Sequence, residues 1–280
     1  MDKTIHLYGS LSLSRKHIQN FVSDTKEIVG SSLNIVKNEL LNLSESTGVD
    51  VSNISRLIGN LSSSYDDIDS DKKRLAFLEK RGLYLPPIKY RLDNRFQGLK
   101  RTSSGQKKKS SVEDEAYVYL FPLRTMMKKI LELPGVYDEI LHYTNLLHTE
   151  KYVVSNFIQS KLWQKKIKNW NRADPVFPLI MSNDDYETGN ALSGHAGQNK
   201  LAGTYINLPC FPPQYQSSLS SILHALLYYS KDREKFGNTA IFKNLIEEFR
   251  FLEIEGVELS LPRGSQKIYF KLALLTGDNL

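Results

Sequence analysis

Apolar residues recur at helical spacing through the first eighty residues of the chain. Three amphipathic segments are expected, at residues 10–45, 51–61 and 69–80. Ser14 stands just before the first of these apolar patterns, where its hydroxyl can cap a helix. The pair Pro86-Pro87 then interrupts regular structure. The pattern therefore predicts a helical N-terminal region over residues 1–88.

The middle of the chain changes character twice. Residues 89–115 are rich in Lys, Arg, Ser and Gly and contain few residues that can bury surface, which predicts a basic flexible linker or loop. Residues 116–174 form a connecting region that we expect to be mainly helical. Its expected elements are a short strand at 116–121 and helices around 126–131, 137–147 and 154–170.

The last part of the chain has strand-like patterns. Strands are expected at residues 176–181, 201–208, 257–261 and 267–275, and an amphipathic helix at 240–255. Residues 221–229 suit either a strand or a short buried helix, and periodicity does not decide between them. A helix before the last strand favours parallel pairing of the first and last strands through a right-handed crossover. The fold class predicted is α+β or α/β, with helices followed by a mixed sheet.

Two of these expected strands run into an aspartate. Asp184 follows the strand at 176–181, and Asp278 follows the strand at 267–275. Neighbouring strands lie about 4.8 Å apart, so the two carboxylates of a parallel pair would share one edge of the sheet. Such a pair suits Mg²⁺ or Mn²⁺ and phosphodiester chemistry, with Asp185 as a weaker candidate ligand. The plainer alternative is a loop cap or a solvated turn.

Charge points weakly to an acidic partner. The formal net charge is +6 and the pI is about 9.1, which favours nucleic acid without requiring it. Lysines gather in two places, first at Lys107, Lys108 and Lys109, and then at Lys165, Lys166 and Lys168. Clustered lysines can contact phosphates. The alternatives are a solvated linker for the first group, and for the second a packed helix in which Trp163 and Trp170 are buried.

Cysteine content and hydropathy limit the cellular compartments in which the protein is expected. The chain has one cysteine, Cys210, which excludes an internal disulfide and a cysteine-rich zinc site. No uninterrupted apolar stretch approaches the length of a membrane span, so no membrane partner is expected. We therefore expect a reducing compartment, either the cytoplasm or the nucleus.

Short motifs in residues 175–280 occur in a characteristic order. They are Asn183–Glu187, Asn190–Ser193, Gly197–Lys200, Leu208–Pro213, Ser230–Arg233, Phe236–Asn238, Phe251–Glu253 and Gly277–Leu280. Together they resemble the transposase core of CACTA (En/Spm-type) DNA transposons, and most closely the transposon-derived proteins of animals. This chain departs from that pattern at Ala191, where a proline is usual, and at Asn199, where a histidine is usual.

The resemblance implies an RNase H-like fold with an acidic triad that binds Mg²⁺ or Mn²⁺. It makes Asp184 the first metal aspartate and Asp278 the second, and it implies DDE/D-type DNA strand cleavage and transfer. The third acid would lie after Leu280, so an incomplete, truncated core with little or no activity is expected. We also expect marginal stability or exposed apolar surface near residues 268–275.

The same resemblance implies DNA as partner and favours the nucleus, and it leaves a homo-oligomer open. His195 and Lys200 would lie beside the site and contact phosphate, although an exposed loop histidine is the plainer interpretation of His195. The alternative function is a non-catalytic nucleic-acid-binding or interaction protein that retains the fold.

Overall fold

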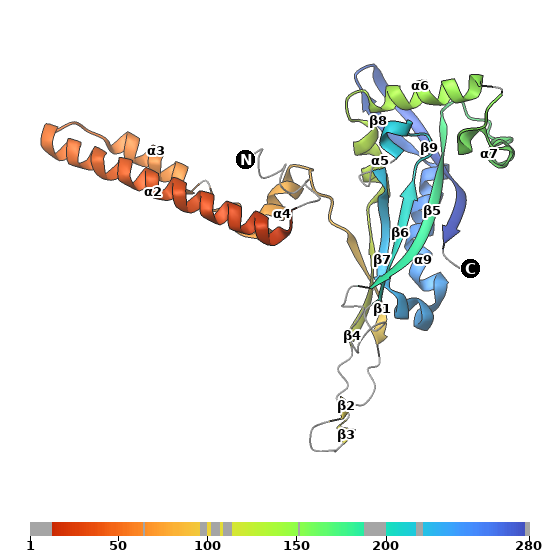
Figure 1. Cartoon of the computed structure of the whole chain (residues 1–280), viewed down its shortest axis with the longest axis horizontal. Helices are drawn as coiled ribbons and strands as arrows, with labels where there is room; N and C mark the ends of the chain where they lie inside the picture. The colour runs from red at the N-terminus through yellow and green to blue at the C-terminus, as the bar shows by residue number, and fades with distance from the viewer. Residues whose placement is uncertain are drawn as a thin grey trace. The chain divides into compact units, whose positions relative to one another are not determined.

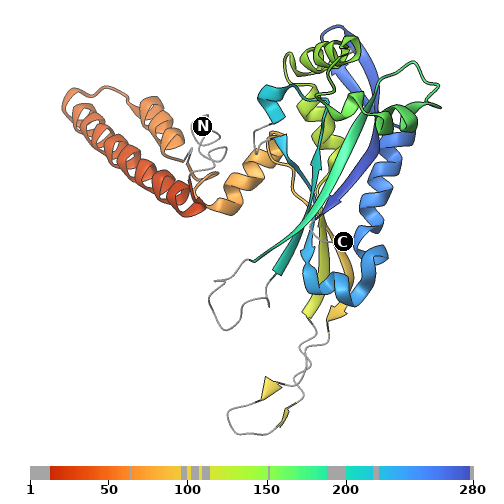
Figure 2. The same ribbon diagram turned by 45° about the vertical axis from the view of Figure 1, so that its right-hand side comes forward.

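The computed structural model describes residues 13–63, 65–95, 100–101, 107–108, 114–150, 152–187, 200–216 and 221–277. The chain divides into two compact units, which we call the helical unit, Met1–Leu85, and the sheet unit, Pro86–Leu280. Figures 1 and 2 show the helices of the first and the mixed sheet of the second. Each unit is described by itself.

The helical unit contains α2 (Arg15–Thr47), α3 (Ser52–Ser63) and α4 (Asp71–Lys80). These three helices confirm the sequence prediction. The Ser14 hydroxyl accepts a hydrogen bond from the backbone N–H of His17 and caps α2. Gly48, with φ 68°, ends the same helix in the left-handed conformation that glycine adopts without strain. The chain then turns, and α3 runs back beside α2 (Figure 1).

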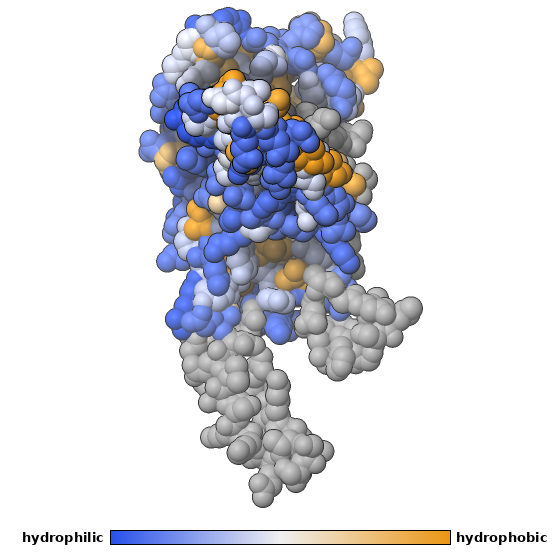
Figure 3. Space-filling model, turned by 90° about the vertical axis from the view of Figure 1, so that its left-hand side faces the viewer, coloured by the Kyte–Doolittle hydropathy of each residue, from blue (hydrophilic) through white to orange (hydrophobic). Residues whose placement is uncertain are grey.

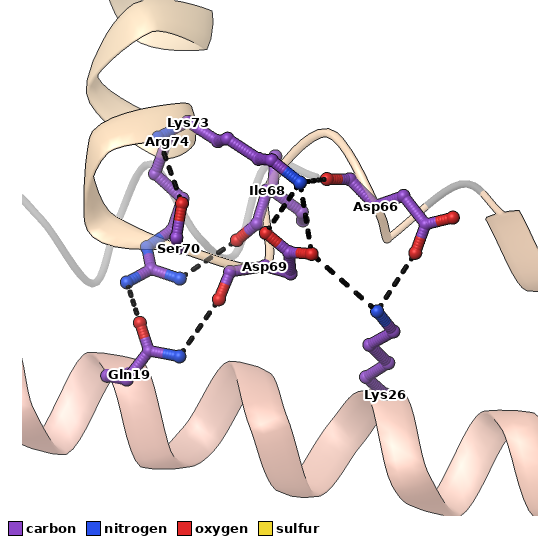
Figure 4. Close-up of polar contacts among 8 residues, drawn as sticks. All are labelled: Gln19, Lys26, Asp66, Ile68, Asp69, Ser70, Lys73 and Arg74. Atoms are coloured by element: carbon purple, nitrogen blue, oxygen red, sulfur yellow. Dashed lines mark hydrogen bonds and ion pairs between the residues drawn. The ribbon is translucent and has the colours of Figure 1, made fainter.

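A polar network ties the chain before α4 to α2 (Figure 4). The buried guanidinium of Arg74 donates hydrogen bonds to the Ile68 carbonyl (2.8 Å) and to the Gln19 side chain (2.5 Å). Gln19 in turn donates to the Asp69 carbonyl over 2.9 Å. Lys26 of α2 pairs with Asp66 at 2.9 Å. Hydrogen bonds and ion pairs therefore form much of the contact between α2 and the chain around α4.

The sheet unit is built on seven strands in the order β1-β4-β7-β6-β5-β9-β8. Their bounds are β1 Ile88–Arg95, β4 Asp114–Leu120, β5 Val176–Glu187, β6 Lys200–Asn207, β7 Leu223–Tyr229, β8 Val257–Leu261 and β9 Gly264–Gly277. β5 and β9 are parallel, whereas the other neighbours in this sheet are antiparallel. The predicted parallel pairing of the first and last core strands is thus confirmed. Two short strands, β2 (Lys100–Arg101) and β3 (Lys107–Lys108), pair with each other.

Helices pack against this sheet. They are α5 (Leu123–Leu131), α6 (Val136–Thr149), the 3₁₀ turn η1 (Phe157–Gln159), α7 (Lys161–Ile167), α8 (Pro213–Gln216) and α9 (Ser230–Ile254). The longest, α9, runs along one face of the sheet (Figure 2) and buries Ile241, Leu245 and Leu252. Gly237 takes φ 78° inside it, which allows a kink between two helical pieces.

The two faces of the sheet differ where α9 crosses it. In β4, Ala116, Val118 and Leu120 are buried, and the tyrosines between them are only half-buried. In β7, buried Tyr228 packs edge-on against Phe242 of α9, with ring centroids 5.8 Å apart. The buried set therefore faces α9, and the alternate set forms a second face, which we call the open face.

Two elements differ from the sequence prediction, and a third settles a choice that the sequence left open. The start of the predicted linker is strand β1, because its backbone pairs with β4 from Ile88↔Leu120 onward. The helix expected at 154–170 is interrupted, since Ser160 takes an extended conformation and caps a shorter α7. Residues 223–229, for which strand and helix were both open, form strand β7 between β4 and β6.

The expected exposed apolar surface near residues 268–275 is largely wrong. β9 pairs with β8 over residues 264–268 and with β5 over residues 269–277. Ile268, Phe270 and Ala273 are at most 2% exposed. Only the end of the segment agrees with the expectation, because Leu275 is 57% exposed.

Candidate functional site

Asp184 and Asp185 lie within strand β5, rather than in a loop after it. β5 continues to Glu187 because it pairs with β6 through residues 180–187. Asp184 lies opposite Gly203 and Asp185 lies opposite Ala202, and both aspartates are exposed. Successive side chains of a strand point to opposite faces. The two carboxylates therefore cannot share one metal ion.

Asp185 is on the face that α9 covers. On this face the Thr204 hydroxyl and the Tyr228 phenol both donate to Oδ1 of Asn183, each over 3.0 Å. Burial raises the pKa of Tyr228, and the nearby negative charge of Asp185 raises it further, whereas Arg233 opposes this shift. Asn183 is thus held in place by two strands, and the side chains around it are fixed.

Asp184 is on the open face, among aromatic side chains. The Tyr205 ring lies against Gly203, because a Cβ atom on Gly203 would come within 2.6 Å of the Tyr205 hydroxyl oxygen. Burial raises the pKa of Tyr205, and the charges of Tyr186 and Asp184 add to the shift. The ring of His224 follows, with its centroid 4.8 Å from that of Tyr205, and burial lowers the pKa of this histidine.

The predicted metal site of Asp184 and Asp278 stays a prediction, because only Asp184 belongs to the described residues. Within residues 13–277, apart from the undescribed gaps, no three or more His, Cys, Asp or Glu side chains gather as metal ligands. The parallel register places Asn183 opposite Gly277, the residue before Asp278. Asp278 itself lies outside the described residues. The described carboxylates alone therefore do not fit a Mg²⁺ or Mn²⁺ ion.

The second lysine cluster surrounds a packed tryptophan. Trp163 is 2% exposed, which confirms the helix-packing alternative for this residue. Lys166 donates to the Leu272 carbonyl over 3.3 Å, so it is bound to the sheet. Lys165 and Lys168 are exposed.

Trp170 also packs inside the sheet unit. Its ring meets Tyr269 edge-on with centroids 5.1 Å apart, and its Nε1 donates to the Asp174 carbonyl. Arg172 lies over the same Tyr269 ring at 4.3 Å. This tryptophan therefore packs against protein rather than projecting as a free platform for bases.

The other predicted nucleic-acid contacts are only partly described. Lys200 begins β6, is exposed and lies opposite Glu187. Lys107 and Lys108 belong to β3, and their side chains are outside the described part of the chain. Lys109 and His195 also lie outside the described residues. The predicted contacts of these residues stay predictions.

Sequence reasoning missed the open face as a candidate site. Tyr117 and Tyr119 alternate with buried residues of β4, and the Lys89 ammonium lies 3.5 Å from the centroid of the Tyr117 ring. The alternation Glu-Ala-Tyr-Val-Tyr-Leu over residues 115–120 was the available signal. It shows that one face of β4 is apolar and the other is aromatic.

Three further facts concern the helices, the surface and the comparisons with known proteins. In the described part of the chain, no helix combines the length and the hydropathy needed to cross a membrane. In the view of Figure 3, hydrophobic residues form separate spots on a mainly hydrophilic surface. Compared with known proteins, the chain matches no protein-family model and no curated protein.

Proposed function

We propose that the sheet unit is a transposase-type, RNase H-like core that binds DNA. The observation that carries this proposal is the parallel pairing of β5 with β9 after the antiparallel strands β6 and β7 and the long helix α9. The motif resemblance implies a mixed sheet with such a crossover helix. The structure also departs from the simplest form of that arrangement, because β8 intervenes between α9 and β9.

The ancestral activity in this proposal is metal-dependent strand cleavage and transfer. Asp184 lies near the end of β5, and Asp278 follows β9 in the sequence. In a core of this type, Asp184 and Asp278 would help to hold Mg²⁺ or Mn²⁺, which would supply positive charge for displacement at phosphorus. Since the described carboxylates do not form such a site, we assign no step of the reaction to residues of this chain.

A non-catalytic DNA-binding protein is the second candidate. It is favoured because, among the described residues, Asp184 belongs to no group of three or more His, Cys, Asp or Glu side chains that could hold a metal ion. The exposed Lys165, Lys168 and Lys200 could still contact phosphates in such a protein. DNA as partner makes the nucleus the expected compartment, and a homo-oligomer remains a prediction.

Two assays on the full chain test these proposals. Binding of duplex DNA should weaken as salt rises, because lysine–phosphate contacts release counterions. Nicking of supercoiled DNA with Mg²⁺ or Mn²⁺ should then be compared among the native chain, Asp184→Ala and Asp185→Ala. Asp185→Ala is a matched control, since it removes the neighbouring carboxylate from the other face.

The outcomes separate the two candidates. Metal-dependent nicking that Asp184→Ala abolishes and Asp185→Ala retains would establish an active enzyme. DNA binding that both variants retain, without metal-dependent nicking, would establish the non-catalytic protein. If the chain binds no DNA at low salt, both candidates are wrong.

A further inference from the structure

Four neighbouring strands each present a tyrosine on the open face. They are Tyr119 of β4, Tyr229 of β7, Tyr205 of β6 and Tyr186 of β5. Tyr186 is 38% exposed, and the other three are half-buried. Residues that alternate with them, such as Leu120, Tyr228 and Ile206, are at most 2% exposed. The tyrosines therefore lie on the side of the sheet that α9 leaves uncovered.

The strand register shows that these tyrosines share one face. Tyr119 lies opposite Leu227, which lies opposite Gly203. Tyr229 lies opposite Leu201, and Leu201 lies opposite Tyr186. Directly opposed residues of antiparallel strands point to the same face, and so do residues two apart along a strand. The aromatic face thus extends across β4, β7, β6 and β5.

One ring on this face lies against a glycine. The Tyr205 ring lies over Gly203, where only a residue without a side chain leaves room for it. Tyr205 also contacts the His224 ring, which contacts Phe121 at a centroid distance of 5.5 Å. Aromatic side chains on an uncovered sheet face are the groups on which unpaired bases stack.

Basic groups lie at the β1 side of the same face. Lys89 lies opposite Tyr119 and rests over the Tyr117 ring, and Arg91 lies opposite Tyr117 and pairs with Glu115 at 3.3 Å. The amino-acid sequence between β1 and β4 is also basic in composition. Between positions 95 and 112 it contains Lys and Arg residues and no Asp or Glu. Positive charge beside aromatic rings matches a phosphate backbone that carries unpaired bases.

We propose that the open face binds single-stranded DNA, with bases stacked on Tyr119, Tyr186, Tyr205 and Tyr229 and phosphates near Lys89 and Arg91. This inference rests on the proposal that the sheet unit binds DNA, and it names the form of DNA. Duplex DNA keeps its bases stacked on one another, so it cannot use these rings. The Asp184 carboxylate also lies on this face. Its negative charge repels phosphate and should weaken DNA binding there, whether or not Asp184 takes part in cleavage.

The test measures binding of the full chain to a fluorescent oligothymidylate by anisotropy. The double variant Tyr119→Leu/Tyr186→Leu removes two rings from the open face. We expect each lost ring to weaken binding on the order of tenfold. The matched control Tyr119→Phe/Tyr186→Phe keeps both rings and should bind nearly as the native chain does. Fluorescence of Trp163 and Trp170 checks that each variant keeps its fold.

Two single variants give independent readings. Gly203→Ala should raise the Tyr205 ring from the sheet and weaken binding of the single strand, because the new Cβ meets the far end of that side chain. Asp184→Asn should strengthen binding, since it removes a negative charge from the face. A catalytic role for Asp184 alone predicts no such gain.

The results also separate this inference from the proposed function. If the double leucine variant, the double phenylalanine variant and the native chain bound the oligothymidylate equally well, the inference would be wrong. Duplex binding that the native chain still shows would then leave the proposed function standing. If the native chain bound neither single-stranded nor duplex DNA, both the inference and the proposed function would be wrong. Tighter binding of a matched oligouridylate than of the DNA would also overturn the inference, because the occupant would then be RNA.

Discussion

Different interactions stabilise the interior of each of the two units. The 33-residue helix α2 buries only Ile18 and Val22 of the side chains that the structure describes along it. In the sheet unit, by contrast, one continuous apolar cluster joins strands β4 to β9 with helices α5 to α9. A long helix is therefore not a stable one by length alone, because burial of apolar side chains supplies most of the stability of a folded unit.

Exposure gives the same contrast on the outside of the helical unit. Ile28, Ile35 and Leu57 are 67%, 65% and 57% exposed. Such residues add little burial, so the polar network of Figure 4 contributes a larger share of the stability here. We therefore expect the helical unit to open more readily than the sheet unit in hydrogen exchange.

The largest expected effect is a cavity in the sheet unit. Phe270 is 1% exposed and packs against Phe177, with ring centroids 6.1 Å apart. Phe270→Ala should lower the free energy of unfolding by about 3–5 kcal/mol. Both tryptophans, Trp163 and Trp170, belong to the sheet unit, so their fluorescence during denaturant unfolding measures this loss. Unchanged exchange in α2 would show that the units are independent, whereas an equal loss there would contradict the comparison.

The helical unit should respond most strongly at its buried arginine. Arg74→Met leaves the Ile68 carbonyl and the Gln19 side chain without their donor, which should cost about 2 kcal/mol. Arg15→Met is the matched control, because this exposed arginine forms a surface ion pair with Asp71 that is worth less than about 1 kcal/mol. Hydrogen exchange of α2 and α4 should accelerate in the first variant only. Equal acceleration in both would contradict the role given to Arg74.

High pH should weaken the sheet unit through groups that burial keeps protonated. Burial raises the pKa of the Cys210 thiol and that of the Tyr228 phenol above their ordinary values of 9.0 and 10.0. Above those values the unfolded chain holds fewer protons than the folded one, so the free energy of unfolding falls as pH rises. We expect a loss of about 1–2 kcal/mol between about pH 8 and about pH 10. Denaturant midpoints by tryptophan fluorescence measure it, and Cys210→Ala should reduce it; a flat profile would contradict it.

Much of the fold follows from sequence because the signals are local. Ser14 marks the start of α2, and the apolar pattern of residues 240–255 marks most of α9. The parallel pair β5 and β9 follows from one helix that precedes the last strands. These inferences use spacing and caps, which neighbouring residues determine.

The open face was missed for a physical reason. Lys89 and Arg91 are polar and exposed, so β1 has the composition of a linker although its backbone pairs with β4. Likewise, Asp184 and Asp185 look like loop residues, but pairing with β6 continues β5 through them. Backbone pairing accepts polar side chains wherever a face meets solvent, and composition alone does not reveal it.

The smallest expected effect is acid loosening of the helical unit at Asp69. A hydrogen bond from Lys73 lowers the pKa of this carboxyl below its ordinary value of 3.8. Its contribution is therefore present above that value and is lost as pH falls through the lower folded-state pKa. Asp69→Asn should make exchange of α4 less sensitive to pH between about pH 5 and about pH 3. Asp67→Asn is the control, since Asp67 is exposed and forms no ion pair among the described residues. If both variants changed the pH profile equally, the pH dependence would come from the loss of one negative charge and not from the Asp69–Lys73 hydrogen bond.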